Sequence, residues 1–127
     1  MILSINVFSQ ETDALKNQEN INTNNIYEKA DSQALFPGGI NAFRRNFTQV
    51  FDVSRIKGKG KVQSEAMFVI DQQGLITDVI ARGENKSMNK EMERSIKALS
   101  KTKWKPAMIG DIPVKYRYRF PITVNLD

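Results

Sequence analysis

The feature that most constrains the fold is residues 114–124 (V-K-Y-R-Y-R-F-P-I-T-V), where apolar and polar side chains alternate. A period of two is typical of a β-strand with one buried face and one solvated face. Pro121 lies within this stretch and has no backbone N–H for a sheet ladder, so it belongs at a sheet edge. The chain is therefore predicted to end in a long edge strand whose outer backbone groups are available for docking.

The composition limits the chemistry. A chain of 127 residues, 40% of them hydrophobic, is long enough for one modest core. Its net charge of +5 is compatible with acidic protein, anionic lipid or nucleic acid as partner. It contains no cysteine and no histidine, which excludes thiol and imidazole catalysis, disulfides and the usual zinc ligands. We therefore expect no enzyme, no catalytic residues, no metal site and no cofactor.

The N-terminal third has a different character from the rest. Residues 1–9 form a short apolar run with the small residues Val7 and Ser9 at alternate places, the pattern of a signal-peptide remnant and hence of an exported protein. A frayed end or a short extra strand is the alternative. Residues 10–35 are mostly polar and aperiodic, which predicts a disordered linker. No apolar run approaches the roughly 20 residues that cross a bilayer.

Two amphipathic helices are predicted, over residues 40–52 and 88–101. Apolar residues recur at helical spacing in both stretches, with charged residues between them. In the first the apolar positions are Ile40, Phe43, Phe47, Val50 and Phe51; in the second they are Met88, Met92, Ile96 and Leu99. The basic segment 55–61 (R-I-K-G-K-G-K) between helix and sheet lacks a phosphate-loop pattern and is expected to be solvated.

A hairpin is predicted between the helices. Residues 61–70 form a strand that is apolar on both faces near its end, the turn Asp71-Gln72-Gln73-Gly74 follows, and residues 75–82 return. A helix then crosses the sheet to the final strand. These directions give a three-stranded antiparallel sheet of order 2-1-3 with two helices on one face and the C-terminal strand at an edge. This is an α+β architecture.

Four motifs in this order resemble the C-terminal domain of TonB energy transducers. They are F-P-G-G before a helix (36–39), M-F-V-I-D-Q-Q-G-L-I-T-D-V (67–79), W-K-P after a helix (104–106), and G-D-I-P-V-K-Y-R-Y-R-F-P-I-T-V (110–124). The resemblance covers residues 36–127 and is carried by the combination, since the hairpin alone is a common pattern. It implies that these residues form one periplasmic domain.

The resemblance also implies a binding site. In that family an outer-membrane receptor offers a short N-terminal segment that adds as a strand to the last strand of the domain. Carried over by position, the partner-binding strand comprises Val114, Lys115, Tyr116, Arg117, Tyr118, Arg119, Phe120, Pro121 and Ile122. Among these, Lys115, Arg117 and Arg119 are candidates for contacts with acidic residues of the receptor segment.

The chain differs from full transducers in two respects. All its prolines lie within residues 36–127 instead of in a proline-rich spacer, and its apolar N-terminal run is too short to be expected to anchor it in a membrane. The resemblance therefore implies a module that captures the N-terminal segment of TonB-dependent receptors by strand addition, as part of or accessory to energy transduction for nutrient uptake. The expected location is the periplasm.

Two other interpretations remain open. The same strand edge is compatible with pairing to its twin in a homodimer, because exposed edges are often covered in that way. Nucleic-acid binding fits the positive charge but needs exposed aromatic side chains among the basic ones. Here Tyr116, Tyr118 and Phe120 share the face predicted to be buried, so nucleic acid is not expected.

Overall fold

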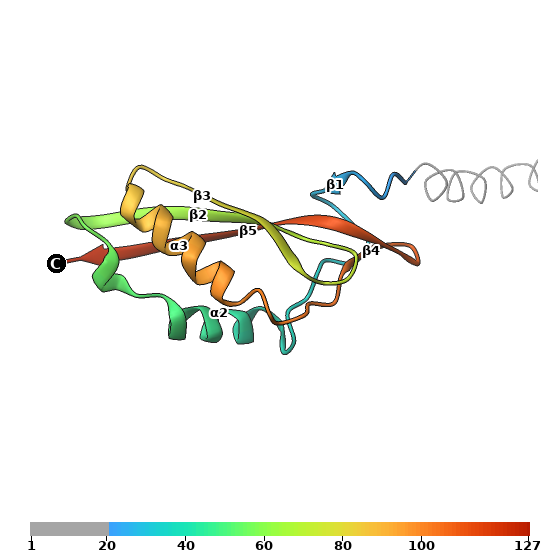
Figure 1. Ribbon diagram of the computed structural model, residues 1–127, viewed down its shortest axis with the longest axis horizontal. Coiled ribbons are helices and arrows are strands. Elements are labelled where there is room, and N and C mark those ends of the chain that lie inside the picture. The colour runs from blue at the N-terminus through green and yellow to red at the C-terminus, as the bar shows by residue number, and fades with distance from the viewer. Residues whose placement is uncertain (1–20) are drawn as a thin grey trace, which may run out of the picture.

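The computed structural model describes residues 21–127, and the predicted signal-peptide remnant, residues 1–9, lies outside them. The elements in chain order are β1 (Ile26–Tyr27), α2 (Gly39–Val50), a 3-10 turn (Val53–Arg55), β2 (Gly60–Ile70), β3 (Ile76–Arg82), α3 (Lys86–Ala98), β4 (Ala107–Ile109) and β5 (Ile112–Leu126). The fold is a mixed α+β structure with two helices and a curled sheet, and Figure 1 shows both helices on one side of the three long strands. Within the described residues, no helix is both long and apolar enough to cross a membrane.

The long strands have the predicted arrangement, but the sheet contains more than them. β2 pairs antiparallel with β3 on one side and with β5 on the other, which is the order 2-1-3. The prediction of three antiparallel strands is nevertheless incomplete, because β1 pairs parallel with β5 and β4 pairs antiparallel with β5. Strands of two and three residues are too short to leave a periodic pattern in the sequence.

The β2–β3 turn is fixed by two residues. The Asp71 carboxylate accepts hydrogen bonds from the Gln73 and Leu75 amides, and Gly74 has φ of 85°. A Cβ on Gly74 would lie 1.9 Å from the Trp104 carbonyl oxygen. Glycine is therefore required here both by the left-handed backbone and by the close approach of the chain that leaves α3.

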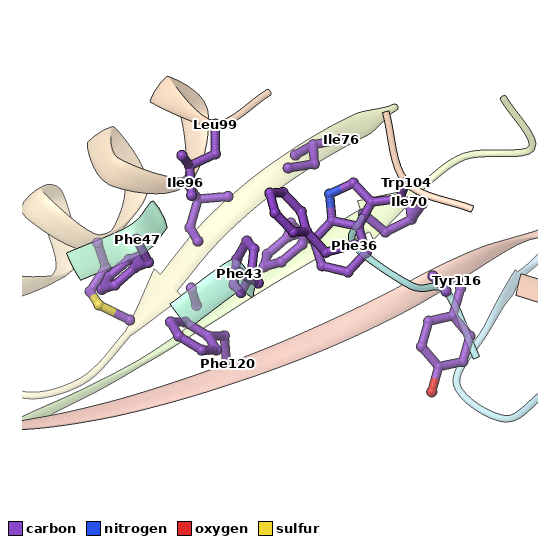
Figure 2. Packing of buried hydrophobic residues seen from close by; sticks show 14 of the residues in the cluster. Phe36, Phe43, Phe47, Ile70, Ile76, Ile96, Leu99, Trp104, Tyr116 and Phe120 are labelled. Atoms are coloured by element: carbon purple, nitrogen blue, oxygen red, sulfur yellow. The ribbon is translucent and has the colours of Figure 1, made fainter. Parts of the chain in front are cut away.

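An aromatic cluster fills the space between helices and sheet. Phe43 of α2 lies at its centre, with ring centroids 4.9 Å from Phe120, 5.1 Å from Trp104 and 5.3 Å from Phe36. Figure 2 shows Phe43 among these rings, with Ile96 of α3 close by. Apart from Ile40, which is 40% exposed, the apolar stripes that predict the helices form one core with the inward side chains of β2 and β5.

A buried carboxylate joins the two helices. Glu91 of α3 is 2% exposed and accepts hydrogen bonds from the Asp52 amide at 2.7 Å and from the Arg94 side chain. Arg94 also donates to the Val50 carbonyl oxygen at the end of α2. Burial alone would raise the pKa of Glu91, but hydrogen bonds from Arg94 and the Asp52 amide outweigh it and leave the pKa below its ordinary value.

Residues 21–35, assigned from the sequence to the linker, lie against the domain. The Thr23 carbonyl oxygen accepts a hydrogen bond from Gln72, and Asp31 accepts one from the Gly110 amide. Ser32 and Leu35 form bridges to residues 108 and 105. These contacts fasten the segment across the end of the sheet where β4 and β5 meet.

Candidate functional site: the outer edge of β5

The candidate site is the edge of β5 that faces away from β2, here called the outer edge. β2 pairs with residues 116–126 of β5 without a shift in register. On the outer side, β1 lies opposite residues 115 and 116 only. Among residues 21–127, no strand pairs with the outer edge over residues 117–126.

Part of the predicted binding strand already has strand partners within the chain. Val114 pairs with β4 and is fully buried, and Lys115 and Tyr116 pair with β1. These residues have strand partners within the chain, so the open part begins at Arg117 instead of Val114. It also extends beyond Ile122, to the end of the strand. The short strands that cover the first part have no periodic signal in the sequence.

Pro121 determines which backbone groups point outward. It lies opposite Glu65 in the antiparallel ladder, and without an N–H it cannot belong to a hydrogen-bonded pair. The neighbouring pairs then carry the hydrogen bonds to β2. By alternation, the N–H groups of Arg117, Arg119, Thr123 and Asn125 point toward the outer edge.

The two faces of β5 differ in chemistry, as the alternation predicts. Phe120 is buried under the helices at 3% exposure, and Tyr118 and Ile122 are half-buried on the same face. Burial raises the pKa of the Tyr118 hydroxyl. Arg117 and Arg119 lie on the opposite face, beside Val69 and Met67 of β2. An added strand would therefore meet an apolar face and a basic face.

Two depressions adjoin the open edge and share the residues Gln33 and Tyr118. One, of about 270 Å³, is lined by Glu28, Gln33 and residues 116–119 of β5. The other, of about 150 Å³, is lined by apolar residues that include Leu35, Ile40 and Trp104. Leu35 and Ile40 are 51% and 40% exposed, so this depression presents apolar side chains to solvent. The edge thus has a basic hollow and an apolar hollow where it opens.

The arginines already have acidic partners within the chain. Arg119 donates to Glu28 at 2.7 Å and to Glu65 at 3.3 Å, and Arg117 lies 3.9 Å from Glu28. The hydrogen bond from Arg119 lowers the pKa of the Glu28 carboxyl. Sequence reasoning missed Glu28, because it lies in a polar stretch with no periodicity. Its presence shows that these arginines can hold a carboxylate.

The opposite edge of the sheet is closed differently. Glu93 of α3 accepts a hydrogen bond from the Ala81 amide of β3 at 3.2 Å. The register between β2 and β3 shifts between Met67 and Val69, and Asp78 has φ of 52°. A bulged strand with a capped N–H is a poor template for a further strand. This leaves the outer edge of β5 as the better docking edge.

The described residues hold no cluster of three or more acidic, histidine or cysteine side chains suited to a metal ion. Comparison with protein-family models, curated proteins and solved structures finds no match for the chain.

Proposed function

We propose that this protein is a periplasmic binding module that captures the N-terminal segment of outer-membrane TonB-dependent receptors by strand addition. It would act as part of or accessory to energy transduction for nutrient uptake. The observation that supports this most is the open outer edge of β5 over residues 117–126. The resemblance of residues 36–127 to the TonB C-terminal domain supplies the identity of the partner.

Main-chain hydrogen bonds hold the receptor segment on β5. The outward N–H groups at Arg117, Arg119, Thr123 and Asn125, with the carbonyl groups between them, can pair with an extended segment of about eight residues. Each such bond contributes about 0.5–1.5 kcal/mol net. Affinity from the backbone alone is therefore moderate and independent of sequence, and selectivity depends on the side chains.

Side chains on the two faces of β5 favour a bound strand, here called the guest, in which acidic and apolar side chains alternate. On one face the guest meets Arg117 and Arg119, which favour carboxylates. On the other it meets Tyr118 and the apolar hollow lined by Leu35 and Ile40, which favours apolar side chains. The same arginines disfavour antiparallel pairing of two copies of β5, because like charges on paired strands repel. This favours an acidic guest over the homodimer.

The test is an NMR titration of the full chain with a peptide that copies the N-terminal segment of a TonB-dependent receptor. Strand capture predicts shifts in the amides of residues 117–125, with those of β3 unchanged. Thr123→Pro removes an outward N–H and should lower the affinity for the peptide. Thr123→Val keeps that N–H and should bind the peptide with the affinity of the parent chain.

Three outcomes would contradict the proposal. They are unchanged amides at residues 117–125, shifts there with an oligonucleotide and none with the peptide, and a stable dimer whose β5 edges are paired. Sedimentation at several concentrations detects the dimer. The first outcome rejects strand capture, the second favours nucleic acid, and the third favours the structural alternative.

A further inference from the structure

The first part of the outer edge is covered by the chain's own β1. Ile26 lies opposite Lys115 and Tyr27 opposite Tyr116, in a parallel pairing. β1 ends there. The next residue, Glu28, forms an ion pair with Arg119, which lies further along β5. Residues 26–28 therefore lie in line with the place where a guest strand would add.

The side chains of this segment match those expected of a guest. Ile26 and Glu28 lie on the basic face: Ile26 lines a depression of about 330 Å³ with Met67 and Arg117, and Glu28 pairs with Arg119. Tyr27 packs toward the core on the other face. The segment thus offers an extended backbone, an acidic side chain to the arginines and an aromatic one to the apolar face.

This segment is held less firmly than the rest of the fold. Its strand has two residues, Ile26 is 38% exposed, and the Glu28 and Arg119 side chains are 52% and 50% exposed. Exposed ion pairs are weak and short strands are easily displaced. The hydrogen bonds of Thr23 and Asp31 hold the segment on either side, so after release it would remain near the edge.

We infer that residues 26–28 are a self-ligand, which covers the start of the outer edge and competes with the guest for Arg117 and Arg119. The inference rests on the proposed strand capture and adds how the site is regulated. A guest that carries a carboxylate between apolar residues displaces Glu28, and its strand then continues from residue 115 along the whole edge. A guest without the carboxylate is confined to the part beyond Arg119.

The test uses a capped peptide that copies residues 22–30 (N-T-N-N-I-Y-E-K-A), titrated by NMR into the full chain and two variants. Glu28→Gln keeps the size of the side chain and removes its charge. Glu84→Gln removes the same charge at an exposed position that forms no ion pair within the described residues. The peptide has no net charge with capped ends, so changes in the total charge of the protein have little effect on it.

Loss of the internal carboxylate should raise the fraction of chains with a free edge. Glu28→Gln should then bind the peptide about two- to fivefold more tightly than the parent chain, the range expected for one exposed ion pair. The Glu84→Gln control should bind like the parent. The outward amide of Lys115, which faces β1, should also exchange faster in Glu28→Gln before any peptide is added.

The two proposals fail in different ways. Equal affinity of the parent chain and Glu28→Gln, with shifts at residues 117–125 in both, overturns the self-ligand and leaves strand capture standing. Equal tightening in the Glu84→Gln control attributes the effect to general charge and also overturns the self-ligand. Absence of binding to all three chains overturns the self-ligand alone, because strand capture is tested by the separate titration with the receptor peptide.

Discussion

The two long edges of the sheet, formed by β3 and β5, differ in how readily another strand could pair with them. Along β3, a register shift, the left-handed Asp78 and the Glu93 carboxylate on the Ala81 amide all oppose the addition of another strand. Along β5, regular pairing with β2 continues through residues 116–126, and within residues 21–127 only the two-residue β1 pairs along the outer side of this stretch. Because proteins commonly protect exposed edges, the regular edge of β5 is the one that we propose as the docking edge.

The difference also explains the charges on β5. Arg117, Arg119 and Pro121 are edge-protecting residues in their own right, since charge and proline discourage indiscriminate pairing. On β3 the protection is built into the backbone and α3. On β5 it resides in side chains that an acidic partner can satisfy. Under the proposed function, the β3 edge is closed to any further strand, whereas the β5 edge accepts a strand with acidic side chains.

The protection of the β3 edge depends on the position of α3, which carries Glu93. Glu91→Ala removes a buried carboxylate and leaves the Asp52 amide and Arg94 without their acceptor, so we expect a loss of about 2–3 kcal/mol in the free energy of unfolding. Denaturant unfolding measures this. Hydrogen exchange should accelerate at β3 more than at the end of β5, and uniform acceleration would contradict a special role of α3 at the β3 edge.

The same carboxylate predicts a pH dependence. The folded-state pKa of Glu91 lies below its ordinary value near 4.5, so its stabilising contribution is complete above that value. The contribution is lost as the pH falls through the folded-state pKa. Stability measured from pH 7 to pH 3 should therefore fall less steeply in Glu91→Gln than in the parent chain. Parallel curves would show that Glu91 does not titrate with unfolding.

A pair of proline substitutions tests the alternation along β5. Ile122→Pro removes an N–H that pairs with β2, and it should cost about 2 kcal/mol of stability through the lost bond and packing. Thr123→Pro removes an outward N–H and should change the free energy of unfolding by less than about 0.5 kcal/mol, but it should lower the affinity for the guest peptide. Thermal unfolding gives both values. Equal destabilisation by the two variants would show that the outward groups are already paired.

The protected edge can be partly opened. Glu93→Ala leaves the Ala81 N–H without its acceptor, and we expect a loss of about 1 kcal/mol in stability. We also expect the receptor peptide to shift amides of β3 that it does not shift in the parent chain. Glu93→Gln retains an acceptor oxygen and serves as the control. A Glu93→Ala protein that behaves like the parent would place the protection elsewhere, in the register shift.

The smallest effect is expected at Asp78. A left-handed backbone costs an ordinary L-residue about 1 kcal/mol, and glycine adopts it freely. Asp78→Gly should therefore raise the free energy of unfolding by about 0.5 kcal/mol, whereas Asp78→Val should lower it. Chemical denaturation of both variants measures the difference. If Asp78→Gly is destabilising, the aspartate side chain contributes more than the strain costs.

Much of this architecture follows from short-range patterns. The alternation in residues 114–124 predicts β5, Pro121 predicts its exposed side, and the apolar spacing from Met88 to Leu99 predicts α3. Each of these elements buries one face, and that requirement is visible in the sequence. The cap of α3 is less visible: the Asn85 side chain accepts from the Met88 amide, although Ser87 and Asn89 are equally suitable residue types.

The contacts that sequence reasoning missed lack periodicity. β1 and β4 are too short for a pattern, and Glu28 is one acidic residue in a polar stretch. Glu91 has the expected polarity for a helix surface, but it is buried beside the segment that follows α2. A buried carboxylate is accepted there because its hydrogen-bond donors come from the end of another element. Such pairings depend on the tertiary arrangement, which residue spacing does not encode.

The most direct test of the open edge is amide hydrogen exchange along β5 without any guest. The account predicts an alternation within one strand. The outward amides of Arg119, Thr123 and Asn125 should exchange rapidly, and the inward amides of Phe120 and Ile122 slowly, with the outward ones slowed when the receptor peptide is added. Slow exchange of the outward amides in the monomeric chain without peptide would contradict the account, because it would show that this edge is already paired.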